Sequence, residues 1–186
     1  MTGISSASYA YFLAFCTITW LSRKPLRQPG SHGFYRFFAW QGILALFAFH
    51  HPSWAENYLS SQPLVSAVLM SSSIVLVISG WLELKRQGRA TVDRRDDTLF
   101  HFEKTTVLVS SGIFRFIRHP MYASLLFLAW GAFWQRPTTP GIVVLAFTTI
   151  SLQLTAHTDE RECLAYFGDA YTAYRQRTWA FVPWIY

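Results

Sequence analysis

Charged side chains are scarce in this sequence of 186 residues, which holds 10 acidic and 16 basic residues, or 14% in all. Soluble domains carry about 25% charged residues. Cysteine is scarcer still, because two residues are too few for a disulfide-rich scaffold. The apolar share of 52%, with 16 Phe, 9 Tyr and 8 Trp, excludes an intrinsically disordered chain. A chain so rich in apolar and so poor in charged side chains is typical of a protein embedded in a lipid bilayer.

Five apolar runs divide the chain. They cover residues 6–22, 37–49 with the preceding Phe34 and Tyr35, 64–82, 120–134 and 141–156. A membrane-spanning helix needs about 20 mostly apolar residues, and the third run has this length. We expect the shorter fourth and fifth runs to extend into their charged flanks or to tilt in a thinned bilayer. The alternative, buried helices of a soluble protein, fits poorly because the chain is too small to bury five of them.

These runs predict an all-α fold, an integral membrane helical bundle with about five transmembrane helices. Because no internal repeat or long linker interrupts the pattern, we expect residues 1–186 to form a single membrane domain. Its N-terminal part, 1–82, holds three helices, and its more polar part, 83–186, holds the other two. Residues 1–10 carry no charge, unlike the basic start of a signal peptide, so we expect the first run to be a membrane helix.

Positive charges are confined to alternate loops. Segments 23–36, 83–119 and 157–186 hold 15 of the 16 Lys and Arg residues, and only Arg136 lies elsewhere. Loops rich in Lys and Arg stay on the cytoplasmic side of a membrane. We therefore expect an external N-terminus and a cytoplasmic C-terminus, in a bacterial inner membrane or in the endoplasmic reticulum of a eukaryote. The same distribution explains the net charge of +6 without a nucleic-acid partner.

Polar residues that suit a ligand site flank the last two apolar runs. Pro120 is typical of the first turn of a helix, so Arg118 and His119 lie just before that helix, at the membrane surface. The short connection at 135–140 makes the last two helices antiparallel neighbours. The acidic pair at 159–160 then lies close to Arg118 and His119. Such a cluster either grips a polar cofactor or forms a structural salt-bridge network.

The C-terminal region has a different pattern. Leu164, Phe167, Tyr171 and Tyr174 form one apolar stripe, which predicts a C-terminal amphipathic helix at the membrane interface. The aromatic end, 179–186, is typical of an interfacial anchor.

Neither a thiol nucleophile nor a metal site is indicated by the cysteines and histidines. Cys16 lies within the first run, and Cys163 has no identifiable base beside it. No HExxH or CxxC pattern occurs. Convergence of His101, His119 and His157 on the cytoplasmic side is the weaker alternative, and we expect no metal ion.

Two blocks of the sequence resemble the isoprenylcysteine carboxyl methyltransferase family and the related phospholipid methyltransferases. Residues 108–122, LVSSGIFRFIRHPMY, are similar to the family's LVTSGxYRxxRHPxY block, and residues 159–174 to its acidic pair followed by FGxxYxxY. The resemblance covers about residues 80–186. It implies an integral membrane enzyme that uses S-adenosylmethionine to methylate a lipid-like or small hydrophobic acceptor dissolved in the bilayer.

The resemblance also implies the site residues. Arg118 and Glu160 take the catalytic roles, and Glu160 is the candidate base if an acceptor must lose a proton. The positions implied to contact the cofactor are Gly80, Thr106, Val107, Leu108, Val109, Phe114, His119, Tyr122, Asp159 and Glu160. Carboxylates suit the hydroxyl and ammonium groups of the cofactor because charge-assisted hydrogen bonds are strong.

Three positions depart from the family pattern. Phe114 replaces the usual tyrosine, Asp159 replaces a glutamate, and Thr155 replaces an arginine implied to hold the acceptor carboxylate. A threonine is a poor substitute for the bidentate arginine that a buried carboxylate needs. The sequence therefore predicts an acceptor other than a prenylcysteine carboxylate.

Two alternatives to a methyltransferase stay open. The DExxCxxxxG pattern at 159–168 and the ending at 181–186 are similar to the C-terminal part of membrane sterol reductases, which use NADPH. Those enzymes are much longer, with about twice as many helices, and this chain lacks their N-terminal half. The second alternative is a non-enzymatic membrane scaffold, which would bind neither cofactor.

Overall fold

The computed structural model describes residues 6–50, 61–88 and 105–184. Within these ranges the chain is helical and has no strand, apart from an isolated bridge between Ile117 and Trp179, so the predicted all-α fold is confirmed. The elements are α1 (Ser6–Leu21), the 3-10 turn η1 (Pro25–Arg27), α2 (His32–His50), α3 (Ser61–Gln87), the 3-10 turn η4 (Gly112–Arg115), α4 (Pro120–Trp134), α5 (Thr139–Phe167) and α6 (Asp169–Arg175).

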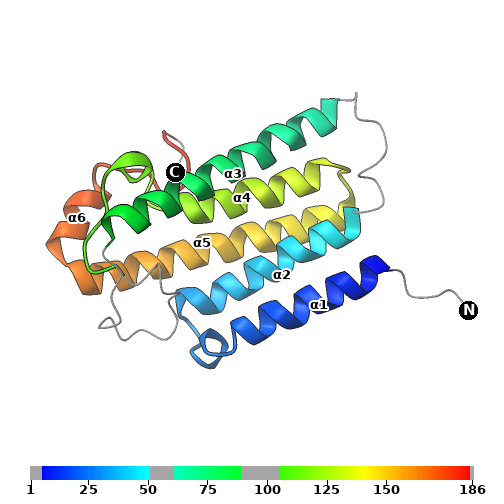
Figure 1. Cartoon of the computed structure of the whole chain (residues 1–186), viewed down its shortest axis with the longest axis horizontal. Helices are drawn as coiled ribbons and strands as arrows, with labels where there is room; N and C mark the ends of the chain where they lie inside the picture. The colour runs from blue at the N-terminus through cyan, green and yellow to red at the C-terminus, as the bar shows by residue number, and fades with distance from the viewer. Residues whose placement is uncertain (1–5, 51–60, 89–104, 185–186) are drawn as a thin grey trace, which may run out of the picture.

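The five long helices lie side by side in the order α3, α4, α5, α2, α1 (Figure 1). Successive helices run in opposite directions. The C-terminal ends of α1, α3 and α5 and the N-terminal ends of α2 and α4 therefore gather beside α6, at what we call the α6 end (Figure 1). The described parts of the basic segments lie at this end, whereas Arg136 follows α4 at the other. The Lys and Arg residues of alternate loops in the sequence therefore gather at one end of the helical bundle.

Small residues allow α3 and α4 to pack closely. An added Cβ on Gly131 would lie 2.8 Å from the side chain of Met70, and the Ser66 hydroxyl donates a 2.7 Å hydrogen bond to the Gly131 carbonyl oxygen. Nearer the α6 end, a Cβ on Gly80 would lie 3.2 Å from Pro120. Small residues and interhelical hydroxyl bonds of this kind are typical of membrane helix pairs. This packing fixes the first turn of α4 against α3.

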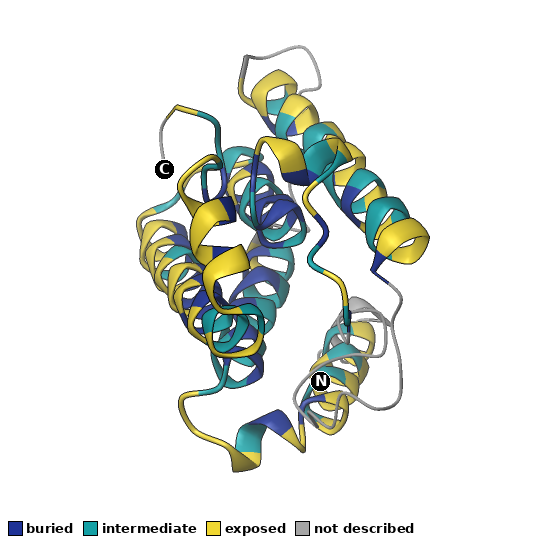
Figure 2. Ribbon diagram, turned by 90° about the vertical axis from the view of Figure 1, so that its left-hand side faces the viewer, coloured by how far each residue is buried: buried dark blue, intermediate teal, exposed yellow. Residues whose placement is uncertain are grey.

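Two helices are long and apolar enough to cross a membrane: Gln62–Gln87 of α3, and Thr139–Phe167. The apolar helices Tyr9–Leu21 and Pro120–Trp134 are shorter. The outer faces of the bundle are widely exposed (Figure 2), with large apolar side chains such as Leu13, Leu64, Val68, Ile78, Val143 and Phe147. Apolar surface on this scale suits contact with lipid. A membrane helical bundle is therefore supported, while five spanning helices stay a prediction.

The C-terminal third differs from the sequence-based expectation. The fifth apolar run, 141–156, was expected to extend into its charged flank or to tilt, and α5 does continue without a break to Phe167. Gly168, at φ +56°, then turns the chain into the short helix α6, and the predicted surface stripe is split at this point. Tyr171 and Tyr174 are each only 3% exposed, because the turn directs them into the protein. The prediction of one continuous helix is therefore wrong, while its location at the membrane interface stays a prediction.

The chain end is also more buried than predicted. Trp179 and Ala180 pair with residues 116–119 through backbone hydrogen bonds of 2.7–3.1 Å, and Ala180 and Phe181 belong to a buried apolar cluster. Trp184 is exposed, and residues 185–186 lie outside the described ranges. Only the last part of the predicted interfacial anchor is thus placed where it meets solvent or lipid.

Candidate active site

A pocket opens at the α6 end, among α3, α4, α5, α6 and the segment that precedes α4. It holds about 750 Å³ of space, mouth included. Its walls are mostly apolar and aromatic, with a few polar side chains from α4 and α5. The pocket therefore combines apolar walls with a few polar groups, as ligand sites commonly do.

Most residues that the sequence singles out converge on this pocket. Segment 105–119 contributes five of them, including the imidazole that precedes α4, while α4 and α5 contribute one residue each. The predicted residues that line the pocket are Leu108, Val109, Phe114, Arg118, His119, Tyr122 and Asp159.

Four predicted residues lie outside the lining. Val107 is largely exposed, and the backbone N–H of Thr106 donates a 3.1 Å hydrogen bond to the Gly88 carbonyl oxygen. Gly80 lies behind the pocket wall, where its lack of a side chain lets α3 approach α4. Glu160 borders a second cavity on the other side of the helix end. Of the predicted acidic pair, Asp159 therefore lines the pocket and Glu160 does not.

Several lining residues were not predicted. They are Leu84, Thr105, Pro120, Met121, Cys163, Phe167, Tyr171 and Tyr174. Three acidic, thiol and aromatic positions, 159, 163 and 167, are spaced by four residues and share one face of α5. That spacing is readable in the sequence, but it indicates a pocket wall only once the rotation of α5 is known.

Glu160 is surrounded by cations. Its carboxylate accepts a 2.8 Å bond from Nε of Arg118, lies 3.1 Å from Nε of Arg175, and lies 3.2 Å from Nε2 of His119. The Glu160 side chain is 8% exposed and that of Arg118 is 10% exposed. A buried carboxylate paired in this way is fully occupied, so Glu160 holds the protein together and does not present an open oxygen to the pocket.

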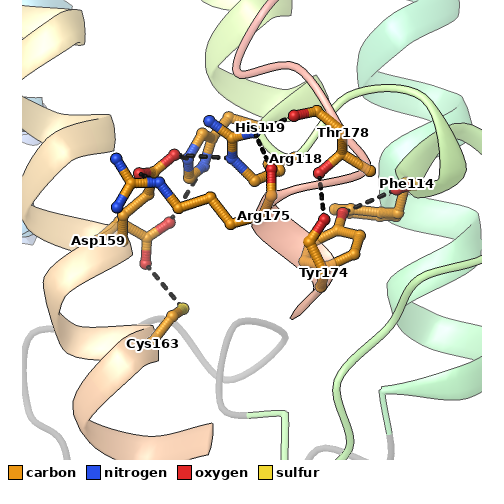
Figure 3. A network of polar contacts seen from close by, with 9 residues as sticks. Phe114, Arg118, His119, Asp159, Cys163, Tyr174, Arg175 and Thr178 are labelled. Atoms are coloured by element: carbon orange, nitrogen blue, oxygen red, sulfur yellow. Dashed lines mark hydrogen bonds and ion pairs between the residues drawn. The ribbon is translucent and has the colours of Figure 1, made fainter. Parts of the chain in front are cut away.

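Arg118 joins this carboxylate to the chain end. Its guanidinium also donates hydrogen bonds to the backbone carbonyl oxygens of Thr178 and, at 3.3 Å, of Arg175 (Figure 3). The 117–179 bridge lies directly beside it. A guanidinium carries five N–H donors in a rigid plane, so it can bind a carboxylate and two carbonyl oxygens at the same time. Arg118 therefore clamps α6 and the following segment to the start of α4.

His119 is held between two acids. Its Nδ1 lies 3.4 Å from Oδ2 of Asp159, its Nε2 lies 3.2 Å from Oε1 of Glu160, and its ring stacks on Tyr122 at 5.4 Å between centroids. Burial lowers the pKa of His119, but the hydrogen bonds and charges of Asp159 and Glu160 outweigh it and raise the pKa above the ordinary value. Both ring nitrogens are thus engaged by the protein itself.

The raised pKa of His119 predicts a pH-dependent stability. Its charged form is favoured in the folded state, so its contribution is complete below the unfolded-state pKa, about 6.5, and is lost as the pH rises through the higher folded-state value. We expect the wild-type melting temperature in detergent to fall through this window. The His119→Gln variant, which does not titrate, should show a flatter profile over the same window. Identical profiles for the two proteins would contradict the charged imidazole.

Tyr174 supports the pocket wall. Its hydroxyl donates a 2.8 Å hydrogen bond to the carbonyl oxygen of Phe114, and it is buried against Tyr171. On the opposite wall, the thiol of Cys163 lies 3.8 Å from Oδ1 of Asp159 (Figure 3). Asp159 is 21% exposed. Asp159 is therefore a carboxylate that a ligand in the pocket can reach.

A further cluster lies where α2 begins. The backbone N–H of His32 donates a 3.2 Å bond to Glu162, and its Nδ1 lies 2.5 Å from the same carboxylate. With Asp159 these residues bring three potential ligand atoms within 4.8 Å of one another, a set that the sequence did not indicate. The carboxylate of Glu162 is already bound by the first residue of α2, as in a helix N-terminal cap.

Of the three histidines that the sequence analysis considered as possible metal ligands, His101 lies outside the described residues.

Comparisons with known proteins identify the family of the chain. A curated relative, methanethiol S-methyltransferase 1 of Bradyrhizobium diazoefficiens, is 34% identical over 74 residues, which cover 39% of this chain and 25% of the relative. The matched part thus spans a quarter of the length of that protein. No solved structure matches the chain. Residues 61–169, more than half of the chain and the part that contains α3, α4 and α5, match the family described as phospholipid methyltransferase. The chain therefore belongs to the phospholipid methyltransferase family.

Proposed function

We propose that this protein is a membrane enzyme that transfers a methyl group from S-adenosylmethionine to a lipid-like or small hydrophobic acceptor. The observation that carries the proposal is the pocket at the α6 end, which combines apolar and aromatic walls with the reachable carboxylate of Asp159. It lies at the end of two helices that are apolar and long enough to cross a membrane. Membership of the phospholipid methyltransferase family supports the same reaction class.

The side chains that line the pocket fit the chemistry of the proposed cofactor. Leu108, Val109 and Phe114 provide apolar surface for an adenine ring, and Asp159 provides an acceptor for ribose hydroxyls or the ammonium group. S-adenosylmethionine, when bound, supplies an electrophilic methyl group. The aromatic walls exclude water around it, and the clamp from Arg118 keeps the start of α4 in place.

The described network offers little general-base capacity. His119 has both ring nitrogens engaged, and Glu160 is occupied by three cationic side chains. This favours acceptors that react without a strong base, such as a sulfur nucleophile that ionises readily in water. The name of the relative, a methanethiol S-methyltransferase, also supports a small thiol as the first acceptor to test.

The acceptor carboxylate of a prenylcysteine has no evident partner at position 155. Thr155 is completely buried, and its hydroxyl donates a 2.7 Å hydrogen bond to the Ser151 carbonyl oxygen of its own helix. A side chain in this position contributes to helix packing. We therefore keep the proposal that prenylcysteine carboxylates are not the acceptor.

A methylation panel tests the proposed function. The purified protein in lipid nanodiscs is given S-adenosylmethionine with a labelled methyl group and either a small hydrophobic thiol, an aminophospholipid or a prenylcysteine analogue. We expect labelled product with a membrane-soluble acceptor and much less with Asp159→Asn at a subsaturating concentration of S-adenosylmethionine. Calorimetry with S-adenosylmethionine and NADPH is run beside it. Binding of NADPH alone would favour a reductase, and binding of neither would favour a scaffold.

We also propose that the α6 end faces the cytoplasm. The described basic segments gather there, and positively charged loops are retained on the cytoplasmic side. Cysteines introduced at positions 3 and 176, in a chain without Cys16 and Cys163, should react with an impermeant maleimide from opposite sides of sealed vesicles. Labelling of both from the same side would contradict a five-span topology.

A further inference from the structure

Most polar groups around the pocket are already used by the protein. His119 contacts a carboxylate with each ring nitrogen, and Arg118 donates to Glu160. The hydroxyl of Tyr174 donates to the carbonyl oxygen of Phe114. A ligand that carries several polar atoms must therefore find its hydrogen-bond partners among the few groups that remain.

The hydroxyl of Tyr171 is such a group. The residue lines the pocket, is 3% exposed, and packs edge-on against Tyr174 with 5.8 Å between ring centroids. No residue in the described ranges hydrogen-bonds its hydroxyl. In those same ranges, two side-chain polar atoms lack a hydrogen-bond partner and are also closed off from solvent: Nε2 of His32 and Oγ1 of Thr149. The Tyr171 hydroxyl is not one of them, so some of its surface remains accessible. A buried phenol therefore ends in the open space of the pocket.

This placement is unfavourable without a ligand. A buried hydroxyl without a partner loses its hydrogen bonds to water, whereas a phenylalanine in the same place would lose nothing. Burial also raises the pKa of Tyr171, so its hydroxyl keeps its proton at neutral pH and acts as a donor. A bound molecule that offers an oxygen or nitrogen acceptor would satisfy the group.

We propose that Tyr171 is a further cofactor-binding residue, whose hydroxyl donates a hydrogen bond to an oxygen or nitrogen atom of S-adenosylmethionine. The inference rests on the proposed function. A hydrophobic acceptor has few polar atoms to offer, whereas the cofactor carries an amino-acid group, a ribose and an adenine. The sulfonium is a poor hydrogen-bond acceptor, so the atom that Tyr171 binds is also present in the demethylated product, S-adenosylhomocysteine.

The two neighbouring tyrosines provide a matched test. Tyr171→Phe and Tyr174→Phe are prepared in the full chain in nanodiscs, and calorimetry measures their affinities for S-adenosylmethionine and S-adenosylhomocysteine. Thermal melting is followed without ligand. We expect Tyr171→Phe to weaken the binding of both ligands by about tenfold, with an unchanged or higher melting temperature, because one hydrogen bond to the ligand is lost. Tyr174→Phe should lower the melting temperature, because the Phe114 carbonyl loses its partner.

The contrary outcomes are distinct. Unchanged affinity of Tyr171→Phe for both ligands would overturn the inference while leaving the proposed function intact. A melting temperature that falls as far in Tyr171→Phe as in Tyr174→Phe, or failure of Tyr171→Phe to fold, would also overturn it by showing a structural role. Wild-type protein that binds neither ligand would instead refute the proposed function, and this inference with it.

Discussion

Replacement of Glu160 by alanine is expected to lower the free energy of unfolding by about 3–5 kcal/mol. The carboxylate lies within 2.8–3.2 Å of nitrogen atoms from Arg118, His119 and Arg175, and it is almost completely buried. Its removal leaves the buried charges of Arg118 and His119 without their partner, which costs more than the pair itself contributes. Denaturant titration of the detergent-solubilised protein, followed by tryptophan fluorescence, measures the change.

Asp169→Ala is the matched control for this substitution. Asp169 is an exposed acid at the start of α6, so its loss should change the free energy of unfolding by less than about 1 kcal/mol. Similar small changes in both variants would show that the network around Glu160 does not stabilise the fold. The result also separates two readings of any lost activity, since a variant that unfolds loses its cofactor site for structural reasons.

The second large effect is expected for Asp159→Asn, which should weaken S-adenosylmethionine binding by about 10- to 100-fold. Asp159 lines the pocket and keeps part of its carboxylate exposed, so a ligand ammonium or hydroxyl group can bind it. Hydrogen bonds to a charged group contribute about 1.5–3 kcal/mol, which corresponds to this range of affinities. Asparagine has the same size and leaves the helix intact. Equilibrium binding in nanodiscs measures the loss.

Glu162→Gln provides the comparison one turn further along α5. Glu162 binds the first residue of α2 and does not line the pocket, so this variant should bind S-adenosylmethionine with the wild-type affinity. Equal losses in both variants would point to a general effect of charge at the α6 end. Unchanged binding by Asp159→Asn would place the cofactor elsewhere.

Together these predictions divide the predicted site residues by role. Arg118 and Glu160, to which the family resemblance implies catalytic roles, lie in a network that fixes the start of α4 to α6 and to the chain end. We propose that they act as positioning residues. Asp159, whose side chain stays partly exposed beside His119 and Cys163, and Tyr171 are the groups in the pocket that a ligand can reach.

The helices themselves were predictable from the sequence. Residues 6–22 and 120–134 were expected to be helical, and the structure has Ser6–Leu21 and Pro120–Trp134. Long apolar runs bounded by charge and proline leave little choice of local structure, since backbone groups in an apolar setting need the internal hydrogen bonds of a helix. The short turn at 135–140 likewise predicted that α4 and α5 are antiparallel neighbours.

The end of α5 was not predictable in the same way. Charged side chains begin at Asp159, and a change from apolar to charged composition is the usual mark of a helix leaving the membrane. The helix continues to Phe167 because its polar positions find partners: Asp159 and Glu160 meet His119 and Arg118, and Glu162 meets the start of α2. Those partners lie 40 or more residues away, so no local pattern reveals them.

The sequence by itself determined the class of structure, the antiparallel helix pair and the meeting of residues 118–119 with residues 159–160, because these follow from apolar length, a short turn and two recognisable blocks. Only the tertiary structure decided which member of the acidic pair reaches the pocket. Asp159 and Glu160 point about 100° apart around α5, and the rotation of that helix is set by the packing of buried residues such as Thr148 and Leu152. Helix rotation depends on contacts with every neighbouring helix at once, and for that reason one carboxylate faces the pocket while its neighbour is enclosed by cations.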